Sequence, residues 1–293
     1  MHTKLISLGQ LIDDSWELYK SRFHELMKVS GWLFILAILY LISLCLYPSA
    51  SALWNATELN GMEQTGVTLF AITSYIISPL IGTLILIGLT RVIRSHVAGR
   101  SANLKSLAKE IKPLFLPTLF VSILVGCYLL LAILIGFGPT IILNILGFIF
   151  QQSILIAIGG ILLIIGIFVS LVLSFCWIIE YTFAPYLTIL DGLRGRKALS
   201  ASRKLVKGRF WHTFVRFIVP KIVFIIFGVL LMAIVSYFTE IILDVSSGLN
   251  LDLSLRIKTM IEWVMPIAIT VLINPLIIIS DLLLLQALKD NPS

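Results

Sequence analysis

The chain has 293 residues, of which 59% are hydrophobic and 13% charged, with a net charge of +7. Soluble domains carry about 25% charged residues and roughly 45–50% apolar ones, so this composition excludes an ordinary soluble fold and suits a bilayer. The basic residues flank apolar segments, which favours an anionic membrane surface over nucleic acid as their partner. No polar stretch approaches the ~50 residues that a separate soluble domain needs.

The first thirty residues predict an amphipathic helix rather than a cleavable signal, because no short basic patch precedes an apolar run. Within segment 8–27, apolar side chains recur at helical spacing and charged ones fall on the opposite face. Ser7 and Gln10 fit a capping box at its start. Helices of this kind lie in the headgroup plane of a membrane, here with Trp16 and Phe23 as interface anchors.

Six stretches are long and apolar enough to cross a bilayer, which takes about 20 mostly apolar residues. They are continuously apolar rather than alternating, which indicates helices and not barrel strands. In chain order they cover roughly residues 30–47, 67–90, 114–136, 154–188, 217–238 and 262–288. The predicted fold class is an all-α integral membrane protein, with six transmembrane helices forming three hairpins in a single domain, each preceded by an amphipathic cytoplasmic helix.

The stretch between Pro113 and Ile179 carries no charged residue. Its length allows three crossings, but three would put the basic loop 191–216 outside the cell, against the positive-inside rule. We therefore expect two crossings, with the surplus from Pro139 to Gln152 forming a re-entrant or interfacial piece that protein or water covers.

A second amphipathic stretch, 197–214, precedes the fifth apolar segment. Its apolar stripe consists of Ala198, Leu199, Ser202, Leu205, Val206 and Phe210. The opposite face is basic, and we expect these side chains to contact lipid headgroups: Arg196, Lys197, Arg203, Lys204 and Lys207. Phe210 and Trp211 are the expected interface anchors. An ordinary juxtamembrane helix without lipid preference gives the same pattern.

Segment 249–257 alternates strictly between apolar and polar residues, which is typical of a half-buried strand. The sequence offers no partner strand, and the alternative is that this segment leads into the last helix.

The basic residues predict the orientation of the chain. All but two of the 22 Lys and Arg residues fall on one side of the six spans, the exceptions being Arg256 and Lys258. Because positive residues concentrate on the cytoplasmic side, both termini are expected inside the cell.

The two amphipathic stretches share the pattern S-x-x-L-x-K-x-R-F, in Ser15–Phe23 and Ser202–Phe210. Similar prolines follow, and their positions are Pro79, Pro185 and Pro275. The last two also begin a Pro-x5-Asp motif that ends at Asp191 and Asp281. We predict an internal repeat of three hairpins, at approximately 1–95, 96–193 and 194–290, with bends at the prolines that either open a central cavity or optimise packing.

Two sequence motifs resemble those of a known group of proteins. They are S-W-E-L-Y-K-S-R-F before the first span and A-L-S-A-S-R-K-L-V-K-G-R-F-W before the fifth span. The chain is similar to uncharacterised six-helix bacterial membrane proteins, a group that includes the membrane domain fused to some glycerophosphodiester phosphodiesterases. The resemblance implies a prokaryotic plasma membrane and a lipid-related context. It does not carry over the phosphodiesterase activity, because this chain has no room for the catalytic domain.

Two carboxylates lie within predicted spans, where an ionisable group costs about 2.5–3.5 kcal/mol at the centre of a helix. These are Glu180 and Asp281, and Tyr181 and Asn274 are polar neighbours in sequence. One interpretation is a site for a cation, a proton or a polar headgroup. The other is that each carboxylate pairs with a snorkelling Arg or Lys from the basic loops as a structural tie.

Neither catalysis nor a cofactor or metal is predicted. The four histidines lie in separate surface segments, no phosphate-binding glycine loop occurs, and Cys45, Cys127 and Cys176 sit in apolar runs without metal spacing. We expect a non-enzymatic component of the cell envelope that binds lipid or a membrane protein partner. The alternative is a transporter or exporter of a small or lipid-like substrate, with a site near Glu180 and Asp281.

Overall fold

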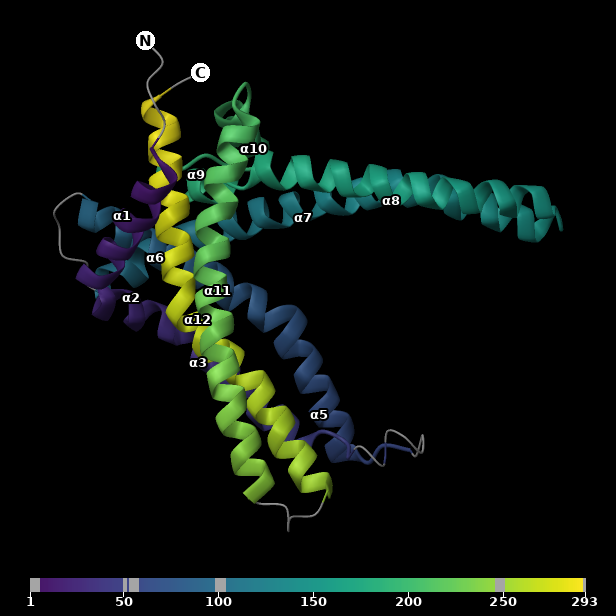
Figure 1. The fold of residues 1–293 in the computed structure, drawn as a ribbon, viewed down its shortest axis with the longest axis horizontal. Coiled ribbons are helices and arrows are strands. Elements are labelled where there is room, and N and C mark those ends of the chain that lie inside the picture. Colours follow the sequence, from purple (N-terminus) through teal and green to yellow (C-terminus); the bar gives the residue numbers. More distant parts are fainter. Residues whose placement is uncertain (1–5, 50–51, 53–57, 98–103, 246–250, 292–293) are drawn as a thin grey trace. The chain divides into compact units, whose positions relative to one another are not determined.

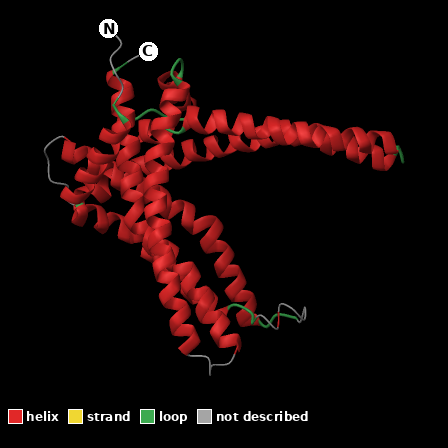
Figure 2. Ribbon diagram, viewed as in Figure 1, coloured by secondary structure: helices red, strands yellow, loops and turns green. Residues whose placement is uncertain are grey.

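The computed structural model describes residues 6–49, 52, 58–97, 104–245 and 251–291. Throughout this part of the chain the regular structure is helical (Figure 2). The elements are α1 (Leu8–Ser21), α2 (Phe23–Ser30), η1 (Gly31–Leu33), α3 (Phe34–Leu46), α5 (Gly61–Ile72), η2 (Thr73–Ile77), α6 (Ser78–Val97), α7 (Leu104–Ile149), α8 (Ser153–Tyr181), α9 (Ala184–Asp191), α10 (Arg196–Val206), α11 (Phe210–Val245) and α12 (Leu251–Asp290).

Six helical segments of the described chain are long and apolar enough to span a membrane, which confirms the predicted fold class. They are Phe23–Leu46, Gly61–Ser95, Lys109–Ile149, Ser153–Asp191, Phe210–Ile241 and Leu253–Asp290. Each predicted span lies within or largely overlaps one of these segments. The protein is therefore a polytopic membrane protein in contact with the lipid bilayer.

The chain packs as two compact units. The first, here called the hairpin unit, comprises Met1–Thr3, Leu116–Val215 and Leu285–Ser293. The second, the bundle unit, comprises Lys4–Phe115 and Arg216–Leu284. The predicted division into three hairpin repeats concerns similarity within the sequence, which the packing into two units does not test. It stays a prediction.

For Pro139 to Gln152 the re-entrant alternative is wrong, and the interfacial alternative stays a prediction. Helix α7 continues without interruption to Ile149, and a tight turn leads into α8, which runs beside α7 in Figure 1. Gln151 takes a positive φ of 52° in this turn, and the Gln152 N–H donates to the Gly147 carbonyl over 2.9 Å. Continuing the helix satisfies the backbone hydrogen bonds within the segment, which a lipid environment requires.

The two helices of this hairpin approach closely at a pair of glycines. A Cβ atom on Gly166 would collide with the backbone of Gly136, and the reverse also holds. Small residues permit such backbone contact between membrane helices. The uncharged stretch from Pro113 to Ile179 thus lies in two long helices, α7 and α8, rather than in two short helices and a re-entrant piece.

The predicted strand over 249–257 is also wrong where the structure describes it. Residues 251–257 form the first turns of α12, while 249 and 250 lie outside the described residues. Without a partner strand, the alternating segment satisfies its backbone groups by continuing the last helix.

The three prolines occupy different helical contexts. Pro79 is the second residue of α6, which follows the π-helical turn η2, and Pro185 lies in the first turn of α9 after the end of α8. Pro275 lies inside α12, which continues through it. Within the bundle unit, α12 also receives a hydrogen bond from α2, because the buried Ser30 hydroxyl donates to the Val271 carbonyl over 2.7 Å. This bond satisfies a carbonyl four residues before Pro275, the acceptor that a proline leaves free.

Candidate functional site

The lead-in helix α10 has one buried face and one basic face. Ala198, Leu199, Ser202 and Val206 are buried, as the sequence pattern predicts, whereas Leu205 and Phe210 of the same predicted stripe are half-buried. Gly192 and Gly195, at φ values of 71° and 53°, form the turn that reverses the chain between α9 and α10. Glycine reaches such values without the Cβ strain of other residues.

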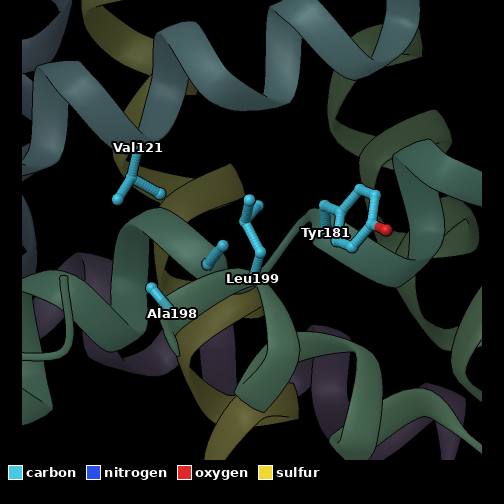
Figure 3. Close-up of a cluster of buried hydrophobic side chains, with 5 residues drawn as sticks. Val121, Tyr181, Ala198 and Leu199 are labelled. Carbon is cyan, nitrogen blue, oxygen red and sulfur yellow. The ribbon is translucent and has the colours of Figure 1, made fainter. Parts of the chain in front are cut away.

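The buried face of α10 packs against other helices of the hairpin unit. Figure 3 shows Val121 from α7 and Tyr181 from the end of α8 around Ala198 and Leu199. Ser202 adds a polar tie, because its buried hydroxyl donates to the Glu180 carbonyl over 2.6 Å. The apolar stripe of α10 thus packs against other parts of the protein, and its polar side is exposed.

The basic face of α10, with Lys207 directly after the helix, brings together all five predicted headgroup residues. Their side chains are exposed: Arg196, Lys197, Arg203, Lys204 and Lys207. Within the described part of the chain, only Arg203 of these five makes an ion pair. The sequence has no acidic residue between positions 192 and 239, so the positive charge of this face has little nearby compensation.

Glu180 meets Arg203 at the edge of this face. The Arg203 Nε lies 3.1 Å from Oε2 of Glu180, close enough for an ion pair, although its N–H does not point at that oxygen. The Glu180 side chain is 21% exposed, and the Arg203 side chain is 60% exposed. Tyr181, the next residue, is buried, with its ring 5.0 Å from that of Tyr128. This carboxylate is therefore paired with a residue of the basic segment, while Tyr181 is part of the apolar core.

Asp281 is paired with Lys221 in the bundle unit. The Lys221 Nζ lies 2.9 Å from Oδ1 of Asp281, and the two side chains are 17% and 6% exposed. The same ammonium group lies 3.1 Å from the centre of the Phe217 ring. A buried charge requires such compensation, since desolvation of an isolated ion is very costly.

Asn274 lies two helical turns before Asp281 on α12, on nearly the same face because seven residues make almost two turns. It lines a groove of about 310 Å³ between α11 and α12, and the lining is otherwise apolar except for Thr270. The predicted set of Glu180, Tyr181, Asp281 and Asn274 is thus distributed over the two compact units.

Several polar ties at the end of the chain were not predicted as a group. Lys289 donates to both carboxylate oxygens of Asp191, at 2.7 and 2.9 Å. Arg209 donates to the Leu288 carbonyl over 2.7 Å and also to the Asn291 carbonyl. Burial lowers the pKa of the Arg209 guanidinium from its ordinary value, which is far above neutral. Both basic residues stabilise the C-terminal end of α12, where the helix dipole favours positive charge.

The sequence did contain one signal for these pairs. Each Pro-x5-Asp motif ends at an aspartate that binds a lysine of another helix: Asp191 binds Lys289, and Asp281 binds Lys221. The motif locates the carboxylates, but the lysines come from other segments and no spacing identifies them.

The two copies of S-x-x-L-x-K-x-R-F share some local features. Ser15 and Ser202 are both buried, and each hydroxyl donates over 2.6 Å to a backbone carbonyl. Phe23 and Phe210 each begin the next helix. The arginines differ, since Arg22 binds Glu25 while Arg209 binds the end of α12.

The fold and these contacts define the class of protein as a polytopic helical membrane protein with six candidate spans, two of which carry a carboxylate paired with a cation. No protein-family model, no curated protein and no solved structure matches this chain. The comparisons therefore identify no family, and the resemblance noted in the sequence is left without support from them.

Proposed function

We propose that this protein is a non-enzymatic component of a prokaryotic plasma membrane, with both termini in the cytoplasm, and that it binds anionic lipid headgroups through α10. The observation that carries the proposal is the division of α10 into a face that packs against protein and an exposed basic face, on which only Arg203 makes an ion pair within the described part of the chain. A cationic surface fixed on a membrane protein attracts anionic lipids by roughly 1 kcal/mol for each Lys or Arg near the bilayer surface.

The aromatic residues that follow α10 support a position at the membrane interface. Trp211 is 67% exposed and packs against Phe175 and Phe214, with ring centroids 6.3 and 5.8 Å apart. Tryptophan is enriched at the level of the headgroups because its ring is both apolar and polar. The basic face of α10 directly precedes this cluster in the chain, so headgroup phosphates are its natural partners.

The proposed orientation rests on the distribution of basic residues, and the structure accounts for one exception to it. Arg256 donates to the carbonyls of Leu44, Cys45 and Tyr47 at the end of α3. Its charge therefore has a local structural use in the bundle unit. These hydrogen bonds are compatible with a position of Arg256 on the side of the membrane opposite the cytoplasm, since they require no contact with lipid headgroups.

The alternative, transport near Glu180 and Asp281, is less well supported. Each carboxylate has a cationic partner, Arg203 and Lys221 respectively. A carboxylate that binds a transported cation must first be released from such a partner. The geometry is that of structural ties, which favours the binding role over transport.

The test is native mass spectrometry of the protein in mild detergent with an anionic and a zwitterionic phospholipid of the same acyl chains. The variant Lys197→Gln/Lys204→Gln/Lys207→Gln removes three exposed charges from the basic face. We expect the wild type to retain the anionic lipid preferentially. The variant should lose at least about tenfold of that preference, since three contacts of roughly 1 kcal/mol exceed the 1.4 kcal/mol of a tenfold change.

The matched control is Lys20→Gln/Lys28→Gln/Lys112→Gln, which removes the same charge from exposed positions outside α10. It should keep the lipid preference if the α10 face is the site. Equal losses in both variants would show that only net charge matters, and no preference in the wild type would contradict the proposal directly.

A further inference from the structure

The groove between α11 and α12 belongs to the apolar part of the bundle unit. Its walls come from residues 225–232 of α11 and 266–277 of α12, inside two of the candidate spans. The helices lie side by side here (Figure 1), because Gly228 allows Ile273 to pack directly against the α11 backbone. The cavity is therefore a surface feature of a tightly packed helix pair within the bundle unit.

Asn274 is the unusual residue of this groove. No hydrogen bond joins its carboxamide to any other residue that the structure describes, whereas the neighbouring Thr270 hydroxyl donates to the Pro266 carbonyl over 2.7 Å. The membrane segment of α7 provides a contrast. There, Asn144 donates to the Thr140 carbonyl over 2.9 Å, and its amide lies against Gly159.

Asn274 lies in the middle part of its candidate span, Leu253–Asp290. It is 16 residues from Asp290 and 21 from Leu253, or roughly 24 and 32 Å along α12 at 1.5 Å per residue, and the nearest charged residue on the helix, Asp281, is paired with Lys221. At that depth acyl chains offer no donor or acceptor, and an unsatisfied polar group in hydrocarbon costs several kcal/mol. A polar group of a neighbouring protein can supply the partner that acyl chains cannot.

We propose that a second copy of this chain docks in the groove, so that Asn274 of each copy hydrogen-bonds to Asn274 of the other. A carboxamide has two N–H donors and an oxygen acceptor, so two of them are mutually complementary. Copies inserted with the same orientation carry Asn274 at the same depth. A two-fold axis along the membrane normal then makes the same patch serve both sides of the interface.

The apolar walls fit the same occupant. Ile225 and Val229 on the rim of the groove are 50% and 61% exposed. Packing between membrane helices relies on close van der Waals contact and on polar side chains that bond across the interface. The groove supplies the van der Waals surface, and Asn274 supplies the polar side chain. A lipid chain would contact the apolar walls but could not bond to Asn274.

The test is energy transfer between donor- and acceptor-tagged copies of the full chain in vesicles, measured while the protein-to-lipid ratio is lowered. Asn274→Leu removes the amide at similar volume, and Asn274→Gln retains it. Val229→Trp fills the groove from an exposed position. The control is Asn144→Leu, which removes a membrane amide that is already bonded to its own helix.

We expect dimers of the wild type, the Asn274→Gln variant and the Asn144→Leu control. The Asn274→Leu variant should dissociate about 3- to 30-fold more readily, which corresponds to the range of interhelical polar contacts in membranes. Val229→Trp should dissociate at least as readily. A monomeric wild type would overturn the proposal, as would dimers that persist in both groove variants or a lipid that co-purifies in the groove of the wild type and is displaced by Val229→Trp.

Discussion

Lys221 and Asp281 form a buried ion pair between α11 and α12, with 2.9 Å between Nζ and Oδ1. The pair joins two membrane helices through their charged side chains, and Phe217 covers the ammonium group. Because neither charge has ready access to water, each depends on the other.

The first prediction follows from this dependence. Lys221→Met should destabilise the fold by about 3–5 kcal/mol, since it removes the cation 2.9 Å from the buried Asp281 carboxylate. The double variant Lys221→Met/Asp281→Leu should recover most of that loss, because it removes both charges. Thermal unfolding in detergent, with the single and double variants compared, provides the measurement. A double variant as unstable as the single one would show that packing and not charge pairing dominates.

The second prediction concerns the more exposed pair. Glu180→Gln should change the free energy of unfolding by no more than about 1 kcal/mol, because the Arg203 side chain is 60% exposed and water screens the pair. The same unfolding assay applies, and Lys221→Met serves as the sensitive reference. A loss as large as that of the buried pair would indicate a role for Glu180 beyond this contact.

The third prediction concerns the cap of α3. Arg256→Ala should cost about 1.5–3 kcal/mol or more, because it leaves carbonyls at the end of α3 without their charged donor. Arg256→Lys should recover little, since an ammonium cannot reproduce the planar fork that reaches three carbonyls. Lys258→Ala is the matched control, and an equal loss in the control would argue against capping as the cause.

The fourth prediction concerns the crossing of α7 and α8. Gly166→Ala should destabilise the hairpin by about 1–3 kcal/mol, because the added methyl meets the Gly136 backbone. Gly160→Ala is the control on the same helix, where nothing lies within 4 Å of the added atom. Because alanine is the better helix former, this control should be neutral or slightly stabilising, and a loss equal to that of Gly166→Ala would refute the close crossing.

The fifth prediction tests the proposed orientation. After replacement of the native cysteines, Met62→Cys should react with an impermeant maleimide in intact cells. Ser200→Cys, an exposed position on α10, should react only after the membrane is opened. The expected difference follows from the positive-inside rule, and labelling of Ser200→Cys in intact cells would contradict the cytoplasmic position of α10.

The turn between α7 and α8 shows where local sequence reasoning failed. The length of the uncharged segment indicated more chain than two ordinary spans need, and re-entrant backbone was the expected use of the surplus. The structure continues the helix to Ile149 instead, with Gln151 in the turn. No residue between Pro139 and Ile149 forbids a helix, and the glycine contact that fixes the hairpin joins positions 30 residues apart.

The two faces of α10, in contrast, were predictable from the sequence. Its amphipathic spacing predicted both the buried stripe and the exposed basic face, because a period of 3.6 residues places side chains on faces without any tertiary information. What the stripe packs against was not predictable in the same way. Val121 and Tyr181 reach it from distant parts of the chain.

The sequence by itself determined six apolar helices and the faces of the amphipathic ones, because bilayer thickness and helical periodicity act on neighbouring residues. Only the tertiary structure decided which cation each of the two carboxylates meets. Glu180 is paired with Arg203, and Asp281 with Lys221. These partners come from other helices, and the same low dielectric that demands a counter-charge leaves its identity to the way the helices pack.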